Sequence, residues 1–388
     1  MKKIAILGST GSIGQQTIDI LRKDKKQFKI LLLTANKNHF LLSKQIKEFD
    51  VKNVFITNKR SYSILKKKFK KVNIFNDINK IDRILTSKID YTMSSIAGFD
   101  GLKPTLKIIK KTKKIAIANK ESIICGWSLI EREIKKHKVK FIPVDSEHFS
   151  IWSVIKNTDP KKIEEVIITA SGGPFFKLKK KNVKKTPKLA TNHPNWKMGK
   201  KISTDSATLM NKVFEVIEAK KIFNIDLNKF KILIHPKSYI HAIVKFNNGL
   251  IKIVAHETDM KIPIFNSIYD NDHKKYKSKK INMKILNNLN FNKVDRKKYP
   301  LIDILKKIPN KNTLFETLLV SINDELVKQF LENKINFEDI SIKLKQILNN
   351  KVFLKFKHKK VNNLAQIEKL NEFVRLKTKS LSVISKSK

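Results

Sequence analysis

The sequence predicts an α/β protein with three parts: an N-terminal Rossmann-like, doubly wound sheet, a central α+β catalytic domain and a C-terminal helical bundle. Over the first 140 or so residues, short apolar runs alternate with longer amphipathic stretches, which is typical of βαβ units and a mostly parallel sheet. Two later strand-like runs meet across Asn247, Asn248 and Gly249, which favours an antiparallel hairpin. After Pro300 the apolar spacing is helical to the end of the chain.

The individual elements follow from the same patterns. The N-terminal strand candidates are 3–8, 28–35, 53–57, 91–98, 114–119 and 139–144, with helical patterns at 15–23 and 102–111. The central strand candidates are 164–171, 231–236, 241–246 and 250–256, beside one long helical pattern at 206–223. These elements predict a first domain at 1–144, a catalytic and dimerisation domain at 145–269, a polar linker at 270–295 and a helical domain at 296–388.

The charge of the chain is strongly positive, with 83 Lys and Arg against 34 Asp and Glu and a formal charge of +49. Such a charge suggests nucleic acid or an anionic membrane as a partner, but only six of the basic residues are arginines, which nucleic-acid sites favour. The lysines are spread along the chain beside many Ile and Asn residues, which indicates a bias toward AT-rich codons. We therefore expect no nucleic-acid partner.

The compartment is predicted from the single cysteine and from the absence of long apolar runs. Cys125 cannot form an intramolecular disulfide, which fits a reducing compartment. No stretch approaches the roughly 18 apolar residues that a membrane span needs, and the N-terminal apolar run is too short for a signal peptide. We expect a soluble, cytoplasmic protein that does not bind a membrane.

A glycine-rich turn follows the first strand candidate. Gly8, Gly11 and Gly14 stand between this strand and a helix, where glycines allow a backbone to approach a pyrophosphate at the helix N-terminus. The spacing is G-x-x-G-x-x-G rather than G-x-G-x-x-G, so a simple tight turn is the alternative. The second strand ends in Asn36, Lys37 and Asn38 without the acidic residue typical of NAD sites, which favours NADP.

Two carboxylates stand one residue apart in this lysine-rich chain. Asp145 and Glu147 follow the apolar run 139–144, and on an extended backbone such residues point to the same face. Two like charges held so close repel each other unless a cation lies between them. A solvated strand end with a helix cap is equally open on local grounds.

Other polar residues stand where they could complete such a site. Asn119, Lys120 and Glu121 follow another strand, and parallel sheets bind ligands at the carboxyl ends of their strands. Asn211 and Glu215 are spaced to share one helical face. Three carboxylates without a Cys or His cluster suit Mg²⁺ or Mn²⁺, with Co²⁺ as a further candidate.

A phosphate pocket is indicated by residues that offer N–H and O–H donors. They are Ser171 with Gly172 and Gly173, and Ser206, Asn211 and Lys212. A glycine turn before Pro174 is the alternative. The polar stretch 192–199 carries Trp196 in a predicted loop, where an aromatic side chain serves as a lid or packs into the adjacent core.

Taken together and in this order, the motifs closely resemble those of 1-deoxy-D-xylulose 5-phosphate reductoisomerases of the non-mevalonate isoprenoid pathway. They are "GSTGSIG" (8–14), "ANKES" (118–122), "PVDSEH" (143–148), "SGGPF" (171–175), "HPNWKMGKKISTDSATLMNK" (193–212) and "HP-x-S" (235–238). The resemblance implies an NADPH- and divalent-metal-dependent enzyme. It would rearrange and reduce 1-deoxy-D-xylulose 5-phosphate, a small phosphorylated sugar, to 2-C-methyl-D-erythritol 4-phosphate, and it would act as a homodimer.

The resemblance also implies roles for individual residues. The NADPH-binding residues would be Thr10, Gly11, Ser12, Ile13, Asn36, Lys37, Asn38, Asn119, Glu121 and Gly199. The metal ligands would be Asp145, Glu147 and Glu215, which with Lys120 form the catalytic set. The substrate would contact Lys120, Ser146, Glu147, Ser171, His193, Ser206, Asn211, Lys212 and Glu215, and the flap would carry Trp196 and Met198.

Several positions depart from the family pattern without removing a proposed ligand. Asn36 replaces a usual glycine, "HETDMKIPI" (256–264) is a drifted form of G-E-P-D-M-R-x-P-I, and "VSIND" (320–324) stands where N-A-A-N-E is typical. The alternative functions are another NADP-dependent dehydrogenase, a decayed non-catalytic homologue that binds NADPH, and a basic nucleic-acid-binding protein.

Overall fold

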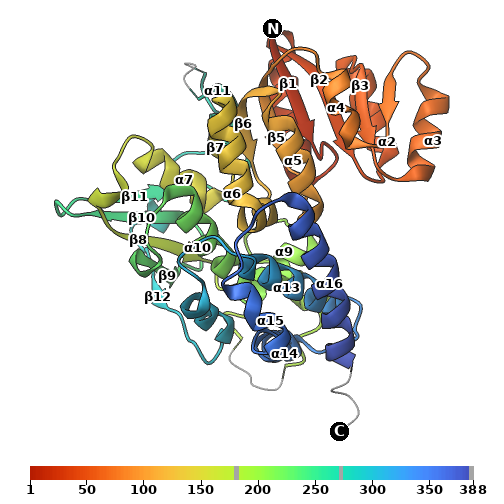
Figure 1. The fold of residues 1–388 in the computed structure, drawn as a ribbon. Coiled ribbons are helices and arrows are strands. Elements are labelled where there is room, and N and C mark those ends of the chain that lie inside the picture. The colour runs from red at the N-terminus through yellow and green to blue at the C-terminus, as the bar shows by residue number, and fades with distance from the viewer. Residues whose placement is uncertain (179–182, 271–273, 384–388) are drawn as a thin grey trace. The chain divides into compact units, whose positions relative to one another are not determined.

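The computed structural model describes residues 1–178, 183–270 and 274–383 (Figure 1). Its contacts divide the chain into two compact units. The first unit comprises Met1–Ile123, Ser128–Phe149 and Met260–Ser278, and the second comprises Ile124–Trp127, Ser150–Asp259 and Lys279–Lys388. The domain boundaries at 144, 269 and 295 stay predictions. Residues 271–273 of the predicted linker and 384–388 of the predicted helical domain lie outside the described residues.

The first unit is built on a seven-stranded sheet in which every neighbouring pair of strands is parallel. In sheet order the strands are β4 (Asn73–Phe75), β3 (Asn53–Ile56), β2 (Phe28–Ala35), β1 (Lys2–Leu7), β5 (Ile89–Ser94), β6 (Thr112–Ile117) and β7 (Lys140–Pro143). The helices are α1 (Ser12–Lys23), α2 (His39–Phe49), α3 (Lys59–Lys68), α4 (Ile81–Ile84), α5 (Leu102–Ile109), α6 (Lys120–His137), the start of α7 (Ser146–Ile155) and α11 (Lys261–Tyr269). The predicted doubly wound sheet is thereby confirmed.

The strand order reverses between β1 and β5, and the glycine turn lies at this point. Open α/β sheets bind ligands in the crevice that such a reversal creates. Gly8 follows β1 with a φ of +85°, and a Cβ there would come within 2.8 Å of the Ser95 carbonyl oxygen after β5. The turn is tight because glycine permits both the left-handed backbone and this close approach.

The second unit contains a five-stranded mixed sheet. In sheet order its strands are β11 (Ile251–Ala255), β10 (Ile240–Phe246), β8 (Ile163–Ala170), β9 (Phe230–Ile234) and β12 (Asn292–Lys293). The predicted hairpin is present, since β10 and β11 are antiparallel and the Gly249 N–H donates to the Phe246 carbonyl at 2.9 Å. Val216, Ala219 and Phe223 pack against the buried side chains of this sheet.

The remaining helices of the second unit include a C-terminal set, as predicted. They are α8 (Pro187–Ala190), α9 (Lys200–Ala207), α10 (Met210–Phe223), α12 (Met283–Leu286), α13 (Phe315–Leu331), α14 (Phe337–Leu348), α15 (Lys351–Leu354) and α16 (Leu364–Val383). The segment predicted as a linker contains α12 and β12, and β12 pairs with β9. Strand β12 is only two residues long, so it shows no alternation of apolar and polar residues from which it could be predicted.

Two local expectations were wrong. The helix predicted at 206–223 is interrupted, because Leu209 takes a left-handed φ of 59° between α9 and α10. The Thr208 hydroxyl bonds to the carbonyls of Thr204 and Asp205 and to the Met210 N–H, which competes with helix continuation. Asp145 and Glu147 are also not on an extended strand, since α7 begins at Ser146.

The glycine turn gives a direct test of this packing. Gly14 lies in α1, where an added Cβ would stand 2.2 Å from the Gly8 carbonyl oxygen. We expect Gly14→Ala to destabilise the protein by about 2 kcal/mol or more, because neither backbone can move without disturbing β1. Denaturant unfolding measures this. Gly199→Ala is the control, since its Cβ meets nothing within 4 Å and its φ is negative. Equal stability of the two variants would contradict the proposed packing.

Candidate active site

The predicted phosphate-binding residues of the cofactor surround the N-terminus of α1. Gly11 is the N-cap residue, and Ser12 and Ile13 are the first residues of the helix. The Gly8 N–H donates to the Thr34 hydroxyl at 2.8 Å, which fixes the turn to the end of β2. Sequence analysis missed Thr34, whose contact reaches across 26 residues. A helix N-terminus with such a turn suits a phosphate group.

The polar end of β2 leads into α2. Asn38 caps this helix by accepting the Leu41 N–H at 3.0 Å. Asn36 accepts a hydrogen bond from the Thr57 hydroxyl at 3.1 Å, and the Lys37 carbonyl accepts one from Ser61. The side-chain oxygens of Asn36 and Asn38 and the carbonyl of Lys37 therefore accept hydrogen bonds that fix the loop.

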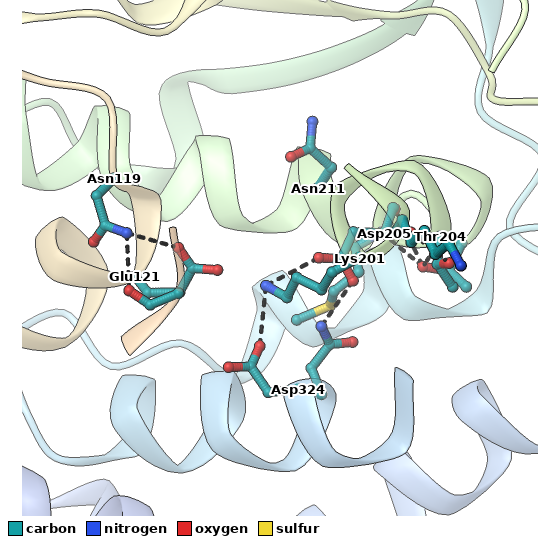
Figure 2. A network of polar contacts seen from close by, with 12 residues as sticks. Asn119, Glu121, Lys201, Thr204, Asp205, Asn211 and Asp324 are labelled. Atoms are coloured by element: carbon teal, nitrogen blue, oxygen red, sulfur yellow. Dashed lines mark hydrogen bonds and ion pairs between the residues drawn. The ribbon is translucent and has the colours of Figure 1, made fainter. Parts of the chain in front are cut away.

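Asn119 fixes the turn between β6 and α6. Its side chain caps α6 by accepting the Ser122 N–H at 2.6 Å and donates to the carbonyls of Ile96 and Gly98. It also lies 3.4 Å from a carboxylate oxygen of Glu121 (Figure 2). These bonds connect the ends of β5 and β6, where the sequence predicted a ligand site.

The acidic pair lies at the start of α7 and is compensated by a buried lysine. The Asp145 carboxylate accepts the Glu147 N–H at 3.1 Å, as a helix cap does, and forms an ion pair with Lys120. His148 Nδ1 lies 3.6 Å from the same carboxylate. The Ser146 hydroxyl donates to Glu147, and Lys120, Ser146 and Glu147 are all buried. The cap that sequence analysis held open as an alternative is thus real.

In the second unit, His193 orients the hydroxyl of Ser171. His193 Nδ1 accepts the N–H groups of Asn195 and Trp196 at 3.2 and 3.0 Å, so the proton of the neutral ring lies on Nε2. That Nε2 donates to the Ser171 oxygen at 2.9 Å, and the Gly173 N–H donates to it at 3.0 Å. Because the oxygen accepts both bonds, its own hydroxyl hydrogen can donate to an anion.

The glycine turn after β8 reaches the end of α9. A Cβ at Gly173, whose φ is +69°, would stand 2.7 Å from the Ser206 carbonyl oxygen. The Tyr299 hydroxyl donates to the Gly172 carbonyl at 2.7 Å and helps to fix the turn. Burial raises the pKa of Tyr299, which keeps this hydroxyl a donor. Sequence analysis missed Tyr299, because 127 residues separate the two partners.

The first turns of α10 carry three of the predicted residues. The Asn211 amide donates to the Glu215 carboxylate at 2.5 Å, as the i, i+4 spacing predicts, and Lys212 forms an ion pair with Glu215. Lys212 and Glu215 are buried. Gly199 caps α9 at the end of the loop 192–199, in which Met198 is partly buried. The ring of Trp196 contacts His241 edge-on at 6.2 Å.

The predicted residues thus fall into one group in each unit. The cofactor residues up to Glu121 lie in the first unit with Lys120, Asp145, Ser146 and Glu147. Gly199 and the remaining substrate, metal and flap residues lie in the second. Each group offers N–H, hydroxyl, ammonium and carboxylate groups suited to phosphate or cation binding.

Comparison with known proteins covers nearly the whole chain. Family models described as 1-deoxy-D-xylulose 5-phosphate reductoisomerase, its C-terminal domain, and DXP reductoisomerase C-terminal domain match residues 4–126, 141–223 and 256–377. The 1-deoxy-D-xylulose 5-phosphate reductoisomerase of Pelagibacter ubique (strain HTCC1062) is 58% identical over 99% of this chain and 100% of its own length. The chain belongs to the 1-deoxy-D-xylulose 5-phosphate reductoisomerase family. The resemblance inferred from the motifs is therefore confirmed.

Solved structures of reductoisomerases have the same fold. The Zymomonas mobilis enzyme in complex with NADPH aligns with a TM-score of 0.87 and 30% identity over 98% of this chain and 99% of that one. A DOX-P reductoisomerase in complex with NADPH, fosmidomycin and magnesium aligns with a TM-score of 0.91 and 29% identity over the full length of both chains. The similarity leaves the nucleic-acid-binding alternative without support. Among the described helices, none has the length and apolarity to cross a membrane.

We expect the buried histidine after β9 to make the stability of this reductoisomerase depend on pH. His235 Nδ1 donates to the Asn290 carbonyl at 3.0 Å, and its buried Nε2 has no hydrogen-bond partner among the described residues. Burial lowers the pKa of His235 below its ordinary value, so the unfolded chain binds the proton more tightly. The contribution of His235 is therefore present at neutral pH and is lost as the pH falls through about 6.5.

We expect His235→Phe to have a lower melting temperature at neutral pH, because it loses the bond to Asn290. It should also have a shallower loss of stability between about pH 7 and pH 5 than the unsubstituted protein. Thermal unfolding across this pH range measures both effects. Parallel pH profiles for the two proteins would contradict the assignment to His235.

Proposed function

We propose that this chain converts 1-deoxy-D-xylulose 5-phosphate into 2-C-methyl-D-erythritol 4-phosphate in the non-mevalonate isoprenoid pathway, with NADPH and a divalent cation. The observation that carries this proposal is the full-length similarity to reductoisomerases together with the intact motif residues. A cytoplasmic location is part of the proposal and is supported by the single, buried cysteine.

The chemistry of the residues fits both a divalent cation and NADPH. Asp145, Glu147 and Glu215 each offer a carboxylate oxygen as a ligand atom, which suits a hard cation such as Mg²⁺ or Mn²⁺. The Gly8 to Gly14 turn and the N-terminus of α1 offer backbone N–H groups to the NADPH phosphates. When bound, the cation would supply Lewis acidity toward the ketone and NADPH would supply the hydride.

The residues of the chain perform the remaining tasks in this mechanism. The hydroxyls of Ser171 and Ser206, the Asn211 amide and the Lys212 ammonium group bind the substrate phosphate, which anchors the sugar away from its reacting carbons. Lys120 donates to the substrate oxygen that gains negative charge during the rearrangement. The rearrangement moves carbon atoms without gain or loss, and it yields 2-C-methyl-D-erythrose 4-phosphate. Reduction of that aldehyde then consumes one hydride and one proton.

The loop that carries Trp196 is proposed as the flap over the substrate. His193 accepts two N–H groups of this loop while it donates to Ser171, so phosphate binding and loop geometry are connected through one imidazole. Closure of such a loop would exclude water from the aldehyde before reduction.

Purified protein should oxidise NADPH only when both 1-deoxy-D-xylulose 5-phosphate and Mg²⁺ or Mn²⁺ are present. Glu147→Gln should lower kcat by about a hundredfold or more, because it removes a charged metal ligand. Absorbance of NADPH at increasing metal concentration measures both. Glu131→Gln is the matched control, since it removes an exposed carboxylate that pairs with Lys135 on α6. Turnover without metal would refute the carboxylate site, and a folded protein without turnover would favour the decayed homologue.

We also propose a homodimer that covers the edge strand β11. Ile251 is 58% exposed and Ile253 is 52% exposed on this strand, which has one neighbour among the described strands, and Leu250 just before it is 58% exposed. Such an edge offers unpaired backbone groups and apolar side chains, and a second copy of the chain would cover both.

Ile253→Lys should therefore shift the protein from dimer to monomer in light scattering coupled to size-exclusion chromatography. Ile342→Lys on α14 makes the same chemical change at a side chain that is also 52% exposed, and it should remain dimeric. A monomeric unsubstituted protein, or an unchanged mass for Ile253→Lys, would contradict the proposal.

A further inference from the structure

A cluster of ionic and amide side chains holds α9 against the C-terminal helices of the second unit (Figure 2). Lys201 forms ion pairs with Asp205 at 3.1 Å and with Asp324 of α13 at 3.0 Å. Asn323 donates to the other Asp205 oxygen at 2.8 Å, and Arg375 of α16 donates to the other Asp324 oxygen at 2.7 Å. We call these five residues the α9 anchor.

The α9 anchor places two buried carboxylates beside two partly exposed cations. It contains two carboxylates and two cations, and Asp205 is only 2% exposed. Both oxygens of Asp205 and both oxygens of Asp324 take part in an ion pair or a hydrogen bond. Removal of one partner from such a set weakens the compensation of a buried carboxylate.

Helix α9 gains little stability from its own sequence. It is eight residues long and has no side-chain cap at Gly199, and helices this short are marginal without tertiary contacts. Asp205 lies in its last turn, where a negative charge opposes the helix dipole. The Asp205 carboxylate thus destabilises the isolated helix. Its contacts with Lys201 and Asn323 compensate for this cost.

The α9 anchor borders directly on residues of the proposed phosphate site. Ser206 follows Asp205 in the chain, and Gly199 joins α9 to the proposed flap. The left-handed Leu209 then ends α9 before Asn211 and Lys212. Helix α13 also contacts α10, since Lys221 and Glu316 form a buried ion pair at 3.0 Å. Helix α13 therefore contacts both α9 and α10, the two helices that carry the proposed phosphate-binding residues.

We propose that Lys201, Asp324 and Arg375 are positioning residues that fix α9 so that the Ser206 hydroxyl faces the substrate phosphate. They act through Asp205 and touch neither substrate nor cofactor. The inference rests on the proposed function of Ser206 and deepens it. It assigns to the C-terminal helix α16 a role in substrate affinity, through a chain of contacts from Arg375 to Asp205.

The test compares Asp324→Asn and Arg375→Gln with the unsubstituted protein in steady-state kinetics. Each variant should raise KM for 1-deoxy-D-xylulose 5-phosphate by about tenfold, because a displaced Ser206 weakens phosphate binding. KM for NADPH and kcat should each stay within about twofold to threefold. Arg375→Lys retains the cation and should recover most of the affinity.

A matched control separates positioning from general destabilisation. Glu332→Gln removes a carboxylate that pairs with Lys334 on the exposed end of α13, and it should leave both KM values unchanged. An unchanged substrate KM in Asp324→Asn would overturn the inference. Equal rises in KM for substrate and NADPH would also overturn it, since general loosening affects both.

Amide hydrogen exchange of α9, measured without substrate, tests the inference independently of the proposed activity. In Asp324→Asn and Arg375→Gln the amides of α9 should exchange at least about tenfold faster, with no change in the Glu332→Gln protein. If the unsubstituted protein fails to oxidise NADPH, the proposed function fails, whereas the exchange rates of α9 still decide whether the anchor holds this helix. Unchanged exchange in the variants would overturn the inference.

Discussion

Each carboxylate among the candidate site residues depends on a nearby donor, which is a cation, an amide or, for Glu147, the Ser146 hydroxyl. Asp145 is paired with Lys120, and Glu215 with Lys212 and Asn211. Desolvation of a carboxylate costs several kcal/mol unless such partners are in place. The same constraint governs Asp205, so the candidate site and the helix that supports it depend on one kind of interaction.

The need for a fixed partner distinguishes the buried lysines of the candidate site from the exposed lysines of the surface. The chain has many more basic than acidic residues, and many ion pairs among the described residues lie on the surface, as between Lys245 and Glu164. Exposed pairs of this kind contribute about 0–1 kcal/mol and are tolerant of change. Lys120 and Lys212 are buried, where their ammonium groups also require a fixed partner. Lysine can therefore accumulate on the surface by codon bias while the buried positions remain constrained.

The parts of the fold that were predicted from the sequence are those set by local pattern. Alternation of strands and helices, the Gly249 hairpin and the glycine turn after β1 each depend on neighbouring residues. The start of α7 and the break at Leu209 escaped prediction because side chains within two or three residues redirect the backbone, through Asp145 in one case and Thr208 in the other. Such side-chain bonds compete with regular structure in ways that apolar periodicity does not reveal.

The supporting contacts of the site escaped prediction for a different reason, which is distance along the chain. Tyr299 reaches Gly172 across 127 residues, and Arg375 reaches Asp324 across 51. The motif residues themselves were found because resemblance preserves their order, but a motif contains no information about what holds it. Asp324 illustrates the point: by resemblance it stands where the family typically has glutamate, and its contacts with Lys201 and Arg375 connect it to α9.

The net positive charge, which composition alone would interpret as a sign of nucleic-acid binding, affects how fast the proposed ligands bind. Both NADPH and the sugar phosphate are anions, and a charge of +49 raises their local concentration and their rate of encounter with the protein. This attraction is long-range, is screened by salt over about 8 Å at physiological ionic strength, and does not distinguish one phosphate from another. Selection between ligands must then come from groups with fixed geometry, such as the Ser171 hydroxyl oriented by His193 and the buried Lys212. Surface lysines can thus accelerate binding, while the buried ion pairs determine what is bound.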